Sequence, residues 1–333
     1  MVNAMLTRLC KAGAMRRVHR WPGLESTRAI VWLGMVVAAG MTISACWSAG
    51  FRLSAGTYPL AGALAVGAAI CLLRPPASFG RNAGLMAMLE GILLFVVTGM
   101  LGALLSYVAM RFSGPFTDDL LDRMDRALGL GWPAIRAAVV ARPWLEGLLT
   151  TAYFACFWMP LAIVVILWRI GRIDRIYPWL LANGIALAMT LAVSAFFPAR
   201  AAFAFYGDPA PPVNALQFGG AIDALRAGSL RDIDLANLGG IITFPSFHAA
   251  MAVLFVWAAW PARRLRVPCV AINLAMWAAA VPIGGHYVVD LIAGSLIAIA
   301  AIMLVAAGER GGRRGFSRSP FPAAPPIPRP GPA

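Results

Sequence analysis

The residues best suited to chemistry lie in two short stretches near the C-terminal end, which hold two of the three histidines in the chain. His248 follows Pro245 and Ser246, and His286 precedes Asp290 by four residues. On a helix, a spacing of four places two side chains on one face, within reach of each other. A carboxylate that binds one ring nitrogen fixes the tautomer and leaves the other nitrogen free as a nucleophile. The spacing therefore predicts that His286 can attack phosphorus while Asp290 stabilises the positive charge developing on the ring.

The first stretch offers groups that complement this nucleophile. His248 can protonate a leaving oxygen as general acid and then act as base toward an acceptor. Pro245 suits the first turn of a helix, whose free backbone N–H groups form an anion site. Ser246 adds a hydroxyl donor for the same anion. Such an assembly suits the transfer of a phosphoryl group and requires no metal and no cofactor.

Other interpretations of these residues stay open at this point. Asp290 can simply neutralise His286, and both histidines can be polar residues that anchor the ends of membrane helices. A metal site made of His248, His286 and Asp290 is less favoured, because no further ligand lies near in sequence and zinc uses three or four protein ligands.

The composition indicates a membrane protein with several spans. Hydrophobic residues make up 60% of the 333 residues and charged residues 13%, and the mean hydropathy is +0.76. Soluble domains carry about 25% charged residues. The formal net charge is +14, but the cations lie mostly between apolar runs, which fits membrane topology and predicts no nucleic-acid partner. The five cysteines are scattered and imply neither a disulfide nor a zinc framework.

The elements that must position the histidines are predicted to be about eight transmembrane helices in an all-α integral membrane fold. The apolar runs lie at about 29–50, 57–73, 84–110, 147–168, 177–197, 244–260, 267–283 and 284–307. A third-span acid, Glu90, is expected near an interface or paired with a neighbouring helix.

Four regions are predicted from these runs. They are a basic cytoplasmic N-terminus (1–28), two accessory transmembrane helices (29–83), a six-helix catalytic core formed by the last six spans (84–307), and a disordered Pro- and Arg-rich tail (308–333). Within the core, the segment 111–146 is expected to form an amphipathic helix on the membrane surface, followed by a second short helix. The long loop 198–243 is expected to contain a second amphipathic helix at about 221–237.

The charges predict the orientation in the membrane. Most of the 28 basic residues fall on the termini and on the loops at 74–83, 169–176 and 261–266, which share one side if there are eight spans. The positive-inside rule makes that side cytoplasmic. Both termini are therefore predicted to be cytoplasmic and both histidine stretches to face outward, in a membrane of the bacterial inner (plasma) membrane type.

The two stretches resemble motifs of a known family. Residues 245–248, Pro-Ser-Phe-His, resemble the second signature motif of the type 2 phosphatidic acid phosphatase superfamily. Residues 286–290, His-Tyr-Val-Val-Asp, together with Ala293-Gly294, resemble the end of its third motif. Residues 125–133 and Phe197-Pro198 further resemble the inositolphosphotransferase branch, which includes fungal inositol phosphorylceramide synthase. The resemblance covers about 84–307 and implies a six-helix phosphatidic acid phosphatase-like core.

This resemblance implies that His286 forms a phosphohistidine, that Asp290 orients it and that His248 is the general acid. The sequence departs from the superfamily at Ala279 and Ala280, where Ser-Arg is expected, and has no counterpart of the first motif, Lys-x6-Arg-Pro. Another cation must therefore bind the phosphate. The candidates are Arg200 first and then Arg226 and Arg231, each of which can equally be a solvated loop charge.

The sequence thus predicts a membrane phosphatase or phosphotransferase, a hydrolase or transferase of lipid metabolism, which acts on a lipid phosphate or phosphodiester through a phosphohistidine at the outer membrane face. The expected partners are a phosphorylated membrane lipid and, in a head-group transferase of the inositolphosphotransferase type, a hydroxyl acceptor that is a lipid or polyol. The alternative is a non-catalytic lipid-binding or transport protein on the same scaffold.

Overall fold

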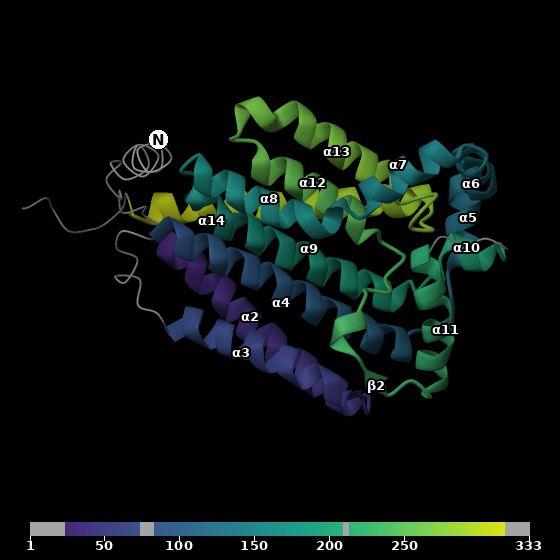
Figure 1. Cartoon of the computed structure of the whole chain (residues 1–333), viewed down its shortest axis with the longest axis horizontal. Coiled ribbons are helices and arrows are strands. Elements are labelled where there is room, and N and C mark those ends of the chain that lie inside the picture. The colour runs from purple at the N-terminus through teal and green to yellow at the C-terminus, as the bar shows by residue number, and fades with distance from the viewer. Residues whose placement is uncertain (1–23, 74–82, 209–212, 317–333) are drawn as a thin grey trace, which may run out of the picture.

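The computed structural model describes residues 24–73, 83–208 and 213–316, and helices form most of this part of the chain (Figure 1). The long helices that run along the molecule are α2 (Leu24–Ser48), α3 (Tyr58–Leu73), α4 (Ala83–Phe112), α8 (Ala155–Arg169), α9 (Ile176–Phe196) and α14 (Val288–Phe316). The shorter ones are α5 (Asp118–Ala127), α6 (Trp132–Val140), α7 (Pro143–Tyr153), α10 (Ala202–Phe205), α11 (Val213–Ala227), α12 (Phe247–Ala259) and α13 (Arg266–Ala279). The predicted N-terminus 1–28 and tail 308–333 lie largely outside the described residues.

Within the described residues, five helical segments are long and apolar enough to cross a membrane. They are Glu25–Ser48, Ala55–Leu73, Gly84–Phe112, Ile173–Phe196 and Val288–Arg310. The predicted span 147–168 is instead divided between α7 and α8, which meet at a bend of 49° and together make a sixth candidate. Helices occupy the two remaining predicted spans, but α12 has 13 residues and α13 has 14, fewer than the about 20 that cross a bilayer. The protein is an all-α membrane protein.

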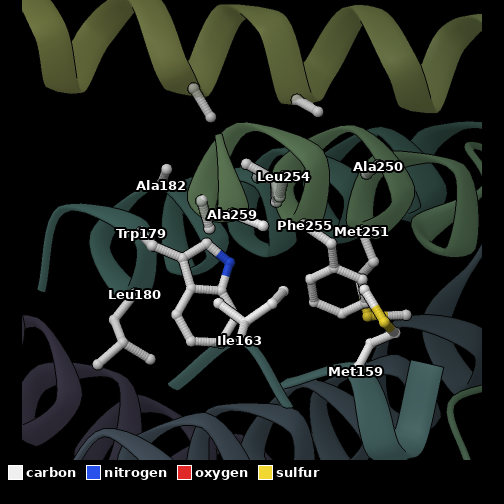
Figure 2. Close-up of a cluster of buried hydrophobic side chains, with 14 of the residues drawn as sticks. Met159, Ile163, Trp179, Leu180, Ala182, Ala250, Met251, Leu254, Phe255 and Ala259 are labelled. Carbon is white, nitrogen blue, oxygen red and sulfur yellow. The ribbon is translucent and has the colours of Figure 1, made fainter. Parts of the chain in front are cut away.

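The helices meet in a core around α9, which packs against α2, α4, α12 and α14. Three aromatic rings from different helices meet there, since the ring centroid of Trp179 of α9 lies 5.4 Å from that of Phe95 of α4 and 6.2 Å from that of Phe255 of α12, and the last two are 6.4 Å apart. Figure 2 shows Trp179 and Phe255 in this core. Helix association in a bilayer depends on close packing rather than on expulsion of water. Gly102 shows how close the packing is, because a Cβ there would lie 2.5 Å from a methyl group of Leu187.

The pairing predicted for Glu90 is confirmed. Its carboxylate accepts hydrogen bonds from Arg28 at 2.8 Å and from Tyr177 at 3.0 Å, and a further one from the indole of Trp32. Glu90 is 2% exposed, so a buried ion pair joins α2 to α4, and the hydroxyl of Tyr177 adds a hydrogen bond from α9. Helix α2 is therefore attached to the core by charge as well as by packing.

The loop before α12 differs from its prediction. The helix expected at 221–237 is wrong in its bounds, since α11 ends at Ala227, where Gly228 adopts a φ of +73° and terminates the helix. The chain then forms β2 (Asp232–Ile233), which pairs in parallel with β1 (Arg52–Leu53) in the turn after α2. The loop and the first helix pair are thus hydrogen-bonded to each other.

The predicted amphipathic helix is present as α5, but several of its acidic side chains are buried and some of its apolar side chains are exposed. The acidic side chains Asp118, Asp122 and Asp125 are buried, whereas Leu120 and Met124 are 43% and 46% exposed. Three acidic side chains of α5 therefore point into the protein together with Leu121, which is 2% exposed, while Leu120, Met124 and Asp119 are exposed. In Figure 1, α5 and α6 lie at one end of the molecule, opposite the described start of α2 and the end of α14.

Candidate active site

The fold brings the two histidine stretches together. His248 lies in the first turn of α12, and His286 lies in the turn just before α14. The centroids of their rings are 6.2 Å apart, with an angle of 59° between the ring planes, and both residues line one cavity. The predicted convergence of two distant segments is therefore found in the structure.

His286 and Asp290 form the expected pair. Nδ1 of His286 lies 3.2 Å from Oδ2 of Asp290, and His286 is 3% exposed. The same carboxylate oxygen accepts the backbone N–H of Tyr287 at 2.9 Å. An ionised carboxylate can only accept hydrogen bonds, so it holds the ring proton on Nδ1 and leaves the lone pair of Nε2 free. The other oxygen of Asp290, Oδ1, is buried without a partner, so its charge is not offset by a second hydrogen bond.

The start of α12 is fixed against α14 by backbone contacts. The N–H of Ser246 donates to the carbonyl of Asp290 at 3.0 Å. One turn further along α14, a Cβ on Gly294 would lie 2.0 Å from the carbonyl oxygen of Ser246. The absence of a side chain at Gly294 thus allows the two helix ends to touch, which sets the distance between His248 and His286.

Ser246 has a different place from the one predicted. Its hydroxyl accepts the N–H of Ala249 at 3.3 Å and so caps α12, and the residue is fully buried outside the cavity lining. A serine at this position is a common helix cap. The structure therefore places Ser246 behind the site, where it orients the first turn of the helix that carries His248.

His248 is held by an aromatic ring that the sequence did not identify. The ring of Tyr153 stacks on that of His248 with centroids 4.2 Å apart and an angle of 19°. Tyr153 is the last residue of α7, directly before the bend into α8. The broken span thus presents the tyrosine to the histidine, a relationship with no signature in the sequence.

Of the three predicted phosphate-binding cations, only Arg200 lines the cavity. Its guanidinium donates to Asp223 at 2.8 Å and lies 4.6 Å from the ring centroid of Phe116. The guanidinium of Arg226 lies over the same ring, 4.0 Å from its centroid, and donates to the backbone carbonyl of Gly114. Arg231 donates to the carbonyl of Gly228 at 3.3 Å. The structure brings Arg200 to the histidines and leaves Arg226 and Arg231 outside the lining.

The backbone beside Arg200 is constrained. Ala201 has φ 88° and ψ 148°, and among the described residues no other non-glycine residue has a positive φ. This region costs about 1–3 kcal/mol for a residue with a side chain. The next residue, Ala202, donates its N–H to the carbonyl of Gly285 at 2.7 Å. The strained segment therefore attaches Arg200 to the turn that carries His286.

The buried acids of α5 hold both of these segments. Asp118 accepts the backbone N–H of Arg200 at 2.9 Å and the hydroxyl of Tyr287 at 3.1 Å. Burial raises the pKa of Asp118, while its hydrogen bonds to Arg200 and Tyr287 act in the opposite direction. One carboxylate thus connects the arginine to the residue after the candidate nucleophile.

Asp125 acts as a cap for a helix other than its own. Its carboxylate accepts the N–H of Val288 at 2.7 Å and that of Val289 at 2.9 Å, the first residues of α14. Burial raises the pKa of Asp125, and these two hydrogen bonds lower it. First-turn N–H groups have no partner within their own helix. Asp125 therefore fixes the start of α14, between His286 and Asp290.

The cavity has a volume of about 430 Å³ and a mostly apolar lining. His248, His286 and Arg200 are among its polar lining residues. The apolar lining includes Val96 of α4 and Phe157 of α8, which are 42% and 76% exposed. The cavity therefore combines groups that suit an anion with side chains that suit hydrocarbon.

No group of three or more His, Cys, Asp or Glu side chains in the described residues has an arrangement that could hold a metal ion. The alternative of a metal site at the two histidines and Asp290 thus has no support from the geometry. The pair and the facing histidine instead suit proton transfer and nucleophilic attack.

Residues 119–304, more than half of the chain, match the family model described as the PAP2 superfamily. The match begins in α5 and ends in α14, and it includes His248, His286 and Asp290. No curated protein and no solved structure matches the chain.

Proposed function

The chain belongs to the PAP2 superfamily, and on this premise we propose that it is a membrane enzyme that transfers the phosphoryl group of a lipid phosphate or phosphodiester through a phosphohistidine. Membership supports a phosphatase-type function in general. The observation that carries the finer proposal is the pair of His286 and Asp290, with the ring of His248 6.2 Å from that of His286 on the same cavity.

In the first step, the lone pair on Nε2 of His286 forms a bond to phosphorus, and the bond from phosphorus to the lipid oxygen breaks. His248, in its protonated form, gives a proton to the departing oxygen, so the lipid leaves as a neutral alcohol. The imidazole gains positive charge as it attacks. The buried carboxylate of Asp290 stabilises that charge, because electrostatic interactions are strong where water is excluded.

In the second step, His248 takes the proton of an acceptor hydroxyl, whose oxygen attacks the phosphohistidine. The bond from phosphorus to Nε2 breaks and His286 returns to its neutral form. With water as acceptor the enzyme is a phosphatase, and with the hydroxyl of a lipid or polyol it is a head-group transferase. The match to the superfamily names no branch, so transfer of the inositolphosphotransferase type is part of the proposal.

Arg200 is proposed as the cation that binds the phosphate, because its side chain lines the cavity with both histidines. A guanidinium supplies several donors in one plane, and its bond to Asp223 uses only one of its nitrogens. Arg231, which lies outside the lining, is the matched control for an Arg200→Ala variant.

The proposed substrate is a membrane lipid whose chain lies along the apolar lining of the cavity. The apolar side chains suit hydrocarbon, and the two histidines with Arg200 suit a phosphate. The protein is a multi-pass membrane protein, and the charge distribution supports an orientation with cytoplasmic termini and an outward-facing site.

The proposal is tested with purified protein and a panel of phosphorylated lipids. Release of free phosphate identifies a phosphatase, and transfer of a labelled head group, including one from an inositol phospholipid, to a lipid alcohol identifies a transferase. His286→Ala and His248→Ala are each expected to lower the rate at least about 100-fold. His19→Ala, in the segment outside the described residues, is the control and should leave the rate unchanged.

Quenching with alkaline SDS during turnover of a phosphate-labelled lipid should trap label on the wild-type protein and none on His286→Ala, because the phosphorus–nitrogen bond of a phosphohistidine is stable in base and hydrolysed in acid. A lipid-binding or transport protein without catalysis would instead bind the same lipids equally well before and after both substitutions and release no product. Full activity in His286→Ala would overturn the phosphohistidine mechanism.

A further inference from the structure

A buried amide on the cavity wall has a carbonyl oxygen without a hydrogen-bond partner. Asn183 lies on α9, lines the cavity and is 2% exposed. Its Oδ1 atom is buried and makes no hydrogen bond. Folded proteins leave few buried polar atoms unpaired, because the lost contacts with water must be replaced. Because the residue lines the cavity, a rotation of the amide, whose oxygen and nitrogen positions are interchangeable, presents this acceptor to a ligand that supplies a donor.

The wall residues around this amide are apolar. Leu187 lies one turn further along α9, and the lining of the same cavity includes Phe95 and Val96 of α4 and Phe157 of α8. A plain hydrocarbon chain would match these side chains and leave the amide oxygen unpaired. A lipid with a hydroxyl or an amide N–H at the level of Asn183 would match both.

The contacts between α9 and α12 show how far Asn183 lies from the histidines along the helix axes. Near the start of α9, Arg175 donates to the carbonyl of Trp257 at 3.2 Å, close to the end of α12. One turn further along α9, Trp179 packs against Phe255, with ring centroids 6.2 Å apart. Higher residue numbers on α9 contact lower residue numbers on α12, so the two helices are antiparallel at this interface.

One turn along each antiparallel helix from the contact of Trp179 with Phe255 leads to Asn183 on α9 and Met251 on α12, and both residues line the cavity. Met251 follows His248 by three residues, which corresponds to about 5 Å along a helix axis. The unpaired oxygen of Asn183 therefore lies only about one helical turn below the level of the histidines. The matching donor belongs to the part of the lipid adjoining the phosphate ester, not to the far end of its chain.

We propose that Asn183 is a specificity-determining residue that accepts a hydrogen bond from a hydroxyl or amide N–H next to the phosphate ester of the lipid. This rests on the proposed function, since the phosphate is assumed to lie at the histidines. It narrows the substrate class to lipid phosphates or phosphodiesters whose backbone carries such a donor, and disfavours backbones that carry only esters and ethers.

The test compares lipids that differ in this donor alone. One pair is a 1-alkylglycerol 3-phosphate with a free 2-hydroxyl and its 2-O-methyl ether. The second pair is an N-acyl amino-alcohol phosphate and its N-methyl amide. Wild-type protein is expected to favour the donor-bearing lipid by about tenfold or more in kcat/KM in at least one pair, which corresponds to about 1.4 kcal/mol or more.

Asn183→Leu is expected to reduce that preference to about twofold or less, mainly by weakening turnover of the donor-bearing lipid. Thr190→Val is the matched control, since Thr190 is also a buried residue of α9 with an unpaired oxygen, yet it does not line the cavity. This variant should keep the wild-type preference. Equal rates within both pairs for the wild-type protein, or an unchanged preference in Asn183→Leu, would overturn the assignment.

A binding measurement separates this proposal from the proposed function. Lipids of each pair are titrated into the His286→Ala protein, and Kd is obtained from the shift in Tm. Tenfold tighter binding of the donor-bearing lipid that depends on Asn183 supports the assignment even if no lipid is turned over. Turnover that depends on His286 without any preference in rate or in binding rejects the role of Asn183 and leaves the proposed function intact.

Discussion

The ring of Tyr153 stacks on the ring of His248, with centroids 4.2 Å apart. Because α7 ends at Tyr153 and the chain bends by 49° into α8, the tyrosine faces the start of α12. Stacked aromatic pairs contribute about 0.5–1.5 kcal/mol beyond the area they bury. The stack therefore restricts the orientation of the ring that is proposed to transfer protons.

Replacing Tyr153 by Ala is expected to lower kcat by about tenfold to 100-fold, because a small misplacement of a catalytic group has effects of this size. Tyr153→Phe keeps the ring and should retain most of the activity. Steady-state rates on a lipid phosphate, with Tm as a check on folding, measure both. A fully active Tyr153→Ala protein would show that the stack does not position His248.

Asp125 provides a second prediction. Asp125→Ala removes the acceptor for the N–H groups of Val288 and Val289, and losing a helix cap costs about 0.5–2 kcal/mol. We expect kcat to fall at least about tenfold with little change in KM, because the start of α14 moves His286 relative to Asp290. Asp125→Asn keeps one acceptor oxygen and should be intermediate.

The pH profile distinguishes positioning from general stability in this variant. If α14 shifts, both the magnitude of kcat and its pH dependence should change, since the His286–Asp290 contact is altered. Asp119→Ala is the control, because Asp119 is an exposed acid on the same helix. Lower Tm with an unaltered kcat and pH profile would limit Asp125 to a structural role.

A third prediction concerns Gly294. A methyl group there would lie 2.0 Å from the carbonyl oxygen of Ser246, so Gly294→Ala must push α12 and α14 apart. Overpacking of this kind costs about 1–3 kcal/mol, and the change in the distance between the histidines should lower activity at least about 100-fold. Melting curves and rates test the two effects separately.

Gly308 of α14 is the matched control, since a Cβ there has no heavy atom within 4 Å. Alanine is favoured over glycine inside a helix by about 0.5–1 kcal/mol, so Gly308→Ala should be neutral or slightly stabilising and fully active. Equal behaviour of the two variants would contradict the close approach at Gly294.

The sequence predicted what depends on local spacing. The four-residue separation of His286 and Asp290 identified the pair without any tertiary information, and the long apolar runs located α2, α3, α4, α9 and α14. Proximity of His248 to His286 was inferred from chemistry, and it is found in the structure because α12 and α14 touch at Ser246 and Gly294.

The features of the site that the sequence did not predict depend on the direction in which a side chain points. The segment 111–146 was predicted to contain an amphipathic helix on the membrane surface, but the pattern did not show that Asp118, Asp122 and Asp125 are buried. Ser246 was predicted only as a hydroxyl donor for the phosphate, and its role as the cap of α12 depends on where that helix begins. Asn183 is one amide in an apolar run, and only the cavity distinguishes it from a buried core residue.

The last prediction concerns the buried ion pair between Arg28 and Glu90, whose Nε and Oε1 atoms are 2.8 Å apart. Removing one partner of a buried pair leaves an uncompensated charge and costs about 3–5 kcal/mol. Arg28→Met and Glu90→Met are therefore each expected to lower Tm strongly and to loosen α2 from α4 and α9.

The double variant Arg28→Met, Glu90→Met should be more stable than either single variant, because it leaves neither charge without its partner. Tm in detergent for the four proteins gives the coupling between the two residues. Since α2 lies outside the region that matches the superfamily, the double variant should also keep its kcat. Additive losses in Tm would contradict a coupled pair, and a loss of kcat in the stable double variant would show that the first helix contributes to the reaction.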